Sequence, residues 1–97
     1  MSSKWVRLGS VRRFDDPWQG GYSSSDFKRR GIEVFYAWVA WVLNQTEEKR
    51  ERLLDSCADV IQATLNLAAA YGVEDFRPWM KECEKRNRER GRITDGR

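Results

Sequence analysis

Two acidic residues in otherwise apolar stretches, Glu33 and Asp59, are the first candidates for chemistry. Each falls within a segment whose apolar residues recur at three- and four-residue steps, which predicts a helix. The short connection 44–46 joins the two segments, so they should be antiparallel neighbours with both carboxylates at similar heights. A buried acid is costly unless it is paired, hydrogen-bonded or bound to a cation. The pattern therefore predicts either a cation site or an ion pair with a nearby base such as Arg29 or Arg30.

The residue types that are missing narrow this chemistry. The chain has no histidine, which excludes a Ser-His or Cys-His dyad, a His-ligated zinc and an imidazole proton shuttle. Its two cysteines, Cys57 and Cys83, form no disulfide framework and no C-x-x-C spacing, so we expect reduced thiols in a cytosolic protein. Any catalysis must come from carboxylates, with lysine and arginine in support.

Glycine, proline and charge patterns divide the chain into three parts. Residues 1–22 contain no sustained period of 2 or 3.6 and form an irregular arm, residues 23–92 a helical domain, and residues 93–97 a frayed tail. We expect the arm to lie over the helices or to reach a neighbouring chain, anchored by its aromatic residues Trp5, Phe14 and Trp18.

The helical domain should contain three helices. The first should run from about 25 to 44, the second from about 47 to 70 or 71, and the third from 76 or 77 to about 90. Residues suited to begin and end helices stand at their boundaries: Thr46 and Asp75 as N-caps, Pro78 in a first turn, and Gly72 and Gly91 after last turns.

The predicted second helix is apolar on two faces, one formed by Leu54, Cys57, Ala58, Ile61, Leu65 and Ala68, the other by Leu53, Val60 and Leu67. A helix that is apolar on two sides packs on two sides. Gly31 in the first helix costs about 1 kcal/mol relative to Ala, which indicates the close approach of another helix. We therefore expect an all-α protomer, a three-helix antiparallel bundle, that forms a homodimer through its first two helices.

Basic residues are concentrated at the C-terminal end. Residues 77–97 hold eight basic and four acidic side chains, a local charge of +4 that suits an anionic partner. Basic and acidic residues also alternate there, as on a solvated helix face, so two interpretations remain: solvation, or phosphate contact by Arg90 with Lys85 or Arg86. Nucleic-acid binding is disfavoured because interleaved exposed aromatics are missing. No apolar run reaches the roughly 18 residues of a membrane span, and no signal peptide is expected.

Three motifs together resemble the MazG-like nucleotide pyrophosphohydrolases, most closely the small versions found in phages and prophages. They are Glu33-Val-Phe-x-Ala-Trp on the first helix, Cys57-Ala-Asp59-Val-Ile-Gln-Ala-x-x-Asn66-Leu on the second, and Asn87-x-x-Arg90-Gly91 at the end of the third. The likeness covers residues 27–92 and leaves the arm outside it. Each motif is weak alone, but their order and spacing are moderately specific.

The resemblance implies an all-α dimeric enzyme that cleaves nucleoside triphosphates to monophosphate and pyrophosphate. The family uses E-x-x-E on the first helix and E-x-x-D on the second, which converge four carboxylates on Mg²⁺. The metal orients the phosphates and activates a water. Carried onto this sequence, Glu33 and Asp59 are the catalytic and metal-binding acids, and the nucleotide or its phosphates are held by Asn66, Lys85, Asn87 and Arg90.

The sequence departs from this pattern at two of the four ligand positions. Arg30 stands three residues before Glu33, and Ser56 three residues before Asp59. The formal charge of the four positions falls from −4 in the family to −1 here, so Arg30 should repel a divalent cation. One expectation is that Arg30 forms a structural ion pair with Glu33 or Asp59. The other is a displaced metal site built from Asp26, Glu33, Asp55 and Asp59.

Two function hypotheses follow. The first is a Mg²⁺-dependent pyrophosphohydrolase whose activity is weakened or lost through Arg30 and Ser56. The second is a catalytically inactive helical protein, encoded by a phage, that binds a nucleotide or intercepts a host enzyme or defence complex. In that case tryptophans of the arm would be its anchors.

Overall fold

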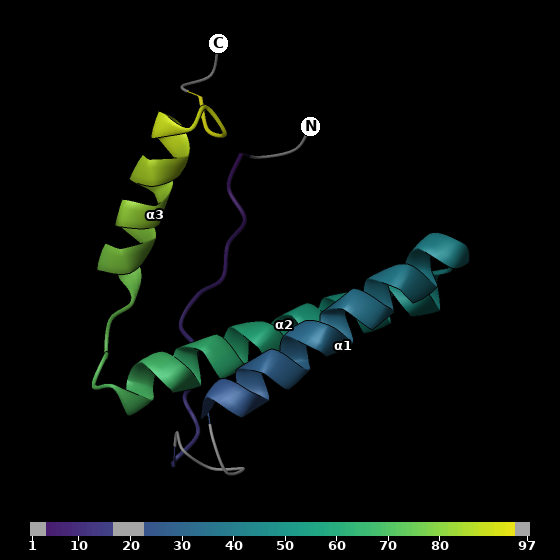
Figure 1. The fold of residues 1–97 in the computed structure, drawn as a ribbon, viewed down its shortest axis with the longest axis horizontal. Helices are drawn as coiled ribbons and strands as arrows, with labels where there is room; N and C mark the ends of the chain where they lie inside the picture. The colour runs from purple at the N-terminus through teal and green to yellow at the C-terminus, as the bar shows by residue number, and fades with distance from the viewer. Residues whose placement is uncertain (1–3, 17–22, 95–97) are drawn as a thin grey trace.

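The described chain is entirely helical apart from its arm and turns. The computed structural model describes residues 4–16 and 23–94, which form three α-helices: α1 (Ser23–Leu43), α2 (Glu47–Ala70) and α3 (Arg77–Glu89) (Figure 1). No strand occurs within these described ranges. The predicted all-α class is therefore confirmed, and each helix lies within two residues of its expected bounds.

A side-chain cap begins α2 and fixes the α1–α2 hairpin. Thr46 has extended backbone angles, and its hydroxyl oxygen accepts a hydrogen bond from the backbone N–H of Lys49 at 3.2 Å. Glu47 and Glu48 place negative charge on the first turn, where the helix dipole favours it. The predicted N-cap is confirmed.

The other end of α2 is closed by Gly72. Its φ of +83° lies in the left-handed region that favours glycine. The backbone N–H groups of Gly72 and Val73 donate to the carbonyl oxygens of Ala69 and Ala68, at 2.9 and 3.1 Å. These bonds satisfy carbonyls that the helix itself cannot, as predicted for a residue just after the C-cap.

The start of α3 differs from the prediction by one position. Its N-cap is Phe76, which makes no side-chain capping bond, whereas Asp75 was expected there. The Asp75 carboxylate instead accepts from the Arg77 backbone N–H at 3.1 Å and pairs with the Arg77 guanidinium at 2.8 Å. This contact with Arg77 lowers the pKa of Asp75 to about 2.

The third helix stands away from the hairpin. In the described residues α1 packs along α2, whereas α3 packs against neither helix, and the arm runs between α3 and the hairpin (Figure 1). The three helices therefore form a hairpin plus an outlying helix rather than a closed bundle. A mainly apolar groove of about 940 Å³ separates the arm, the end of α2 and the start of α3, and its lining includes Leu8, Val11, Ile61, Leu65, Phe76 and Met80.

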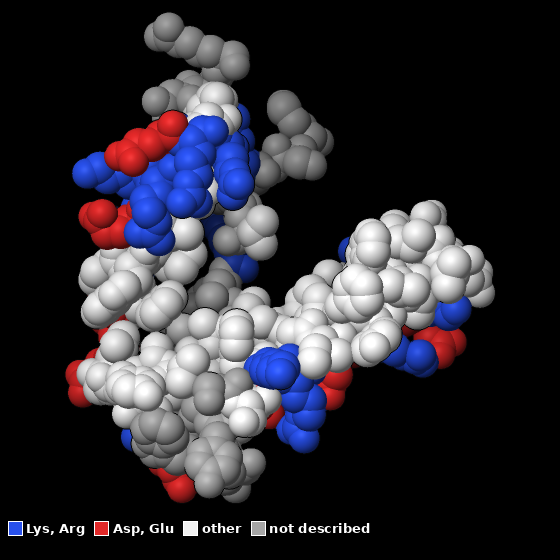
Figure 2. Space-filling model, viewed as in Figure 1, with Lys and Arg blue, Asp and Glu red and all other residues white. Residues whose placement is uncertain are grey.

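This open arrangement buries little. Among the described residues only Ala63 and Asn66 are buried, with 2% and 4% of their surface exposed, and no large side chain is fully enclosed. Charged side chains gather on the outer part of α3 and along one edge of the hairpin, whereas much of the remaining hairpin surface in that view is uncharged (Figure 2). No helix in the described ranges is both long and apolar enough to span a bilayer.

The Thr46 cap yields a stability prediction. Thr46→Ala removes the acceptor for the Lys49 N–H and should lower the free energy of unfolding by about 1 kcal/mol. Urea denaturation followed by circular dichroism, at one fixed protein concentration, measures this change. Gln45→Ala, an exposed neighbour in the same turn, is the control and should change stability by less than about 0.5 kcal/mol. Equal losses in both variants would contradict the capping role.

Candidate functional site

A cluster of one arginine and two acids occupies the first half of α1. Arg30 Nη1 lies 3.1 Å from Glu33 Oε2, and Arg30 Nε lies 3.6 Å from Asp26 Oδ1. Asp26 also pairs with Arg29 at 3.0 Å. The spacings of three and four residues place these side chains one turn apart on the same face of the helix. The expected ion pair between Arg30 and Glu33 is therefore present.

The antiparallel neighbour supplies a third carboxylate to this cluster. The pKa of Arg30 is raised, mainly by its hydrogen bond to Glu33 and further by the negative charges of Glu33, Asp26 and Asp59, although partial burial opposes the rise. Asp59 belongs to α2, so the hairpin brings acids of both helices within electrostatic reach of one guanidinium. We call Asp26, Arg30, Glu33 and Asp59 the arginine–carboxylate cluster.

The cluster is less buried than expected. We predicted that Glu33 and Asp59 would lie in an apolar interior, and this is wrong: Asp59 is exposed, and the Glu33 side chain is 42% exposed. The physical reason is that α3 does not pack against α1 or α2 within the described residues, so it does not cover these acids. These carboxylates therefore remain hydrated and carry little desolvation cost.

Magnesium does not fit these residues as they stand. Arg30 occupies Asp26 and Glu33 with a permanent positive charge, where a metal would need both as ligands. Within the described ranges, no three His, Cys, Asp or Glu side chains are grouped so that they could hold a metal ion. Asp55, the fourth member of the displaced site considered above, is exposed on α2.

Ser56, the other altered ligand position, is turned toward its own helix. Its hydroxyl donates to the carbonyl oxygen of Arg52 at 3.0 Å, a common bond for serine within helices. Ser56 therefore offers no acidic ligand beside Asp59, and the second helix contributes one carboxylate where the family pattern has two.

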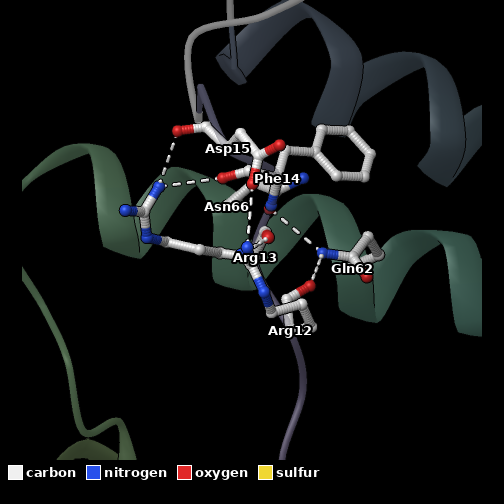
Figure 3. A network of polar contacts seen from close by, with 6 residues as sticks. All are labelled: Arg12, Arg13, Phe14, Asp15, Gln62 and Asn66. Atoms are coloured by element: carbon white, nitrogen blue, oxygen red, sulfur yellow. Dashed lines mark hydrogen bonds and ion pairs between the residues drawn. The ribbon is translucent and has the colours of Figure 1, made fainter.

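Asn66, predicted as a nucleotide contact, holds the N-terminal arm. Its side-chain oxygen Oδ1 accepts from the backbone N–H of Phe14 at 3.0 Å and from Gln62 Nε2 at 3.0 Å. Gln62 Nε2 also donates to the carbonyl oxygen of Arg12 at 3.1 Å, so two polar residues one turn apart on α2 pin the arm (Figure 3). With 4% of its surface exposed, Asn66 has no room for a ligand while the arm is in place.

Gln62 is the residue in this network that motif reasoning missed. The signal was present in the sequence, because Gln62 and Asn66 stand four residues apart and interrupt an apolar helix on the same side. Two carboxamides in that arrangement can form hydrogen bonds with the backbone groups of an irregular segment that crosses the helix. Of the three aromatic residues predicted to anchor the arm, Phe14 contacts α2 through its backbone N–H and is 43% exposed, Trp5 is 70% exposed, and Trp18 lies outside the described residues.

The predicted phosphate contacts on α3 lie apart from the cluster. Asn87 Nδ2 donates to the Cys83 carbonyl oxygen at 3.0 Å, and the Asn87 carbonyl oxygen accepts from the Arg92 backbone N–H at 2.9 Å. With Gly91 at a φ of +75°, these bonds close the end of α3. Lys85 and Arg90 are exposed. Because α3 does not pack against α1 or α2 in the described residues, these two side chains and Arg30 do not belong to one site within a single chain.

Comparison with known proteins identifies no relative of this chain. No protein-family model, no curated protein and no solved structure matches the chain. A functional proposal therefore depends on the side chains described above.

The contact between Asn66 and the arm can be tested by hydrogen exchange. Asn66→Ala removes the acceptor of the Phe14 N–H, which should lower the free energy of local opening by about 1–2 kcal/mol. The Phe14 amide should then exchange about 5 to 30 times faster, as measured by NMR. Asn44→Ala, which removes a carboxamide in the α1–α2 turn, should leave this rate unchanged. An unchanged rate in Asn66→Ala would show that the arm is held elsewhere.

Proposed function

We propose that this chain is a MazG-like relative of the nucleoside triphosphate pyrophosphohydrolases in which Arg30 has taken the place of the metal, so that cleavage is weak or lost. One observation carries the proposal: Arg30 pairs with Asp26 and Glu33 of α1, and the negative charge of Asp59 on α2 adds a weaker attraction to the same guanidinium. In a metal-dependent site of this family, acids of two neighbouring helices act on one cation. Here the cation belongs to the chain itself.

Electrostatics explains why the replacement would suppress metal binding. A unit charge 4 Å from another is worth about 4 kcal/mol at an effective dielectric of 20, and a divalent ion doubles this value. The Arg30 side chain is 33% exposed, so solvent screens part of the repulsion, but the guanidinium stays charged at any ordinary pH. A magnesium ion would have to displace Arg30 from Asp26 and Glu33 before it could use both acids fully as ligands.

The remaining groups are suited to weak phosphate contact. A guanidinium carries five N–H donors, and the contacts of Arg30 with Asp26 and Glu33 are made through Nε and Nη1. Lys85 and Arg90 add exposed positive charge on α3. On this proposal these basic residues contact the phosphates of a nucleotide that is cleaved slowly or held intact, with Lys85 and Arg90 supplied by the second copy of the homodimer, because α3 does not pack against α1 or α2 within the described residues of one chain. The chain works as a homodimer in the cytosol, a setting that suits its two free thiols, Cys57 and Cys83.

The second candidate is an inactive binding protein. It is favoured by the exposed tryptophans, with Trp5 at 70% and Trp79 at 55% of their surface exposed, since tryptophans are frequent anchors of protein interfaces. In this role a phage-encoded chain would occupy a host enzyme or defence complex and would need no metal. The two candidates differ in one measurable property, which is turnover of a nucleotide.

Pyrophosphate release from a panel of deoxynucleoside triphosphates, with Mg²⁺ or Mn²⁺, separates these candidates. We expect slow turnover at best. Any genuine activity should disappear in Glu33→Ala, because this change removes the carboxylate that lies nearest the Arg30 guanidinium, where the proposal places the metal of the related enzymes. Glu51→Ala, an exposed acid elsewhere on α2, should leave the rate unchanged. Activity that survives Glu33→Ala would come from a contaminant or another site, and no activity with any substrate would favour the binding role.

Restoring the two missing acids tests the alignment directly. Arg30→Glu with Ser56→Glu gives four carboxylates at the family positions, and we expect this variant to gain affinity for Mn²⁺ or Mg²⁺ that titration calorimetry detects. Lys28→Glu with Ala58→Glu changes the net charge equally at exposed positions outside the cluster and should bind no more metal than the parent chain. If the first variant also fails to bind metal, the four positions have been aligned wrongly.

A further inference from the structure

The arm and α3, which both line the groove of about 940 Å³ described above, carry charge of the same sign. Residues 4–13 of the arm hold four basic side chains and no acid, and residues 77–94, which are α3 and the turn after it, hold seven basic and three acidic side chains. Each of these two segments therefore has a net charge of +4. We call the groove between them the arm–α3 groove. Because like charges repel, a negatively charged molecule bound there would stabilise both segments.

Most of these basic side chains have no acidic partner in the structure. Every arginine of the α1–α2 hairpin pairs with an acid on its own helix. Within the described ranges, the basic residues of the arm and α3 that form no ion pair are Lys4, Arg7, Arg13, Lys81, Lys85, Arg86, Arg90 and Arg92. Figure 2 shows basic side chains crowded over the outer part of α3. Their positive charge is therefore available to a molecule outside the chain.

The lining of the arm–α3 groove is mainly aliphatic. Ile61 and Leu65 of α2, Leu8 and Val11 of the arm, and Met80 of α3 all contribute to it. Leu8 and Met80 are 59% and 55% exposed, and Ile61 is 37% exposed. Apolar side chains that line a concave surface gain free energy when a partner covers them. A matching partner therefore combines an apolar surface with negative charge on either side of it.

We infer that the arm–α3 groove binds an acidic amphipathic helix of a partner protein. Such a helix lays its apolar stripe into a groove and carries its carboxylates on the flanks, where the arm and α3 supply the cations. The 13 residues of α3 are about 20 Å long, so a bound helix of about four turns can lie along it. This assignment rests on the second proposed function, the binding protein, and names the chemical class of its partner.

Other anions match the groove less well. A small ligand with one carboxylate or phosphate would neutralise few cations of a segment about 20 Å long. A single-stranded nucleic acid stacks its bases on exposed aromatic faces. Among the described residues that line the groove, Phe76 is the one aromatic, and Trp79 stacks against it with ring centroids 6.1 Å apart. The aliphatic lining suits leucine-like side chains better than bases.

Binding of synthetic peptides to the purified full chain tests the inference. The probe is a fluorescein-labelled peptide of about 18 residues, with leucine at every third or fourth position and glutamate at most others. One control peptide has lysine in place of glutamate, and the other has alanine in place of leucine. Fluorescence anisotropy should show that the leucine–glutamate peptide binds at least about tenfold more tightly than either control, and that salt weakens its binding.

Charge reversal on each side of the groove should weaken this binding. Arg7→Glu on the arm and Arg86→Glu on α3 change exposed residues and should each raise the dissociation constant of the leucine–glutamate peptide about fivefold or more. Lys28→Glu is the matched control, because it makes the same change of charge at an exposed position of α1 outside the groove. Salt screens a charge at that distance, so the constant should change by less than about twofold.

Truncation of the apolar lining tests the other half of the match. Leu8→Ala and Met80→Ala shorten exposed side chains, so the fold should be kept, and each should weaken binding about fivefold. Leu43→Ala is the control: Leu43 is 80% exposed at the end of α1 and does not line the groove, so its replacement should leave binding unchanged. Far-ultraviolet circular dichroism checks that all three variants keep their helices.

Several results would overturn the inference. They are the absence of binding by the leucine–glutamate peptide, equally tight binding of either control peptide, or a loss of affinity in Lys28→Glu as large as in Arg7→Glu. A fluorescein-labelled oligothymidylate that binds more tightly than the leucine–glutamate peptide would assign the groove to single-stranded nucleic acid instead.

Pyrophosphate release, measured on the same preparation, separates failure of this inference from failure of the proposed function. A chain that cleaves nucleotides rapidly and also binds the leucine–glutamate peptide would support the groove and contradict only the loss of activity. A chain that neither cleaves nucleotides nor binds the peptide would contradict the groove and leave the binding role to another surface.

Discussion

Two amphipathic helices packed side by side can bury only one stripe of each against the other, and this limit governs the whole structure. In the described residues Ala63 and Asn66 are the buried residues, Asn66 also contacts the arm, and most of the larger apolar side chains stay partly exposed. The third helix does not close over either margin within the described residues. The hairpin surface outside this stripe is therefore either polar and hydrated, as the arginine–carboxylate cluster is, or apolar and exposed, as the groove lined by Phe35, Trp38 and Leu54 is.

The helices themselves could be predicted because their signals are local. Thr46 can cap only the residues that follow it, and Gly72 marks the end of α2 because few other residues adopt a positive φ. The ion pair between Arg30 and Glu33 is local in the same sense, since a three-residue spacing on a helix brings the side chains together whatever the rest of the fold does. Boundaries and neighbouring contacts were therefore accessible from the sequence.

Burial and long-range contacts were not accessible in this way. The acids Glu33 and Asp59 stand in apolar sequence, yet whether they are buried depends on what packs across the hairpin, and nothing in the periodicity states that α3 leaves it. The contact of Asn66 with Phe14 joins residues 52 positions apart, so a motif that assigns Asn66 to a ligand cannot reveal the arm that occupies it.

The stability of this scaffold and its chemistry depend on different residues. Half-exposed ion pairs such as Arg30 with Glu33 contribute roughly 0–1 kcal/mol, so exchanging a carboxylate for arginine at position 30 changes folding little. The same exchange changes the affinity for a divalent cation far more, because it reverses a charge within contact distance of the ligands. A change of charge at position 30 would therefore alter the binding of a cation much more than it alters the stability of the helical hairpin.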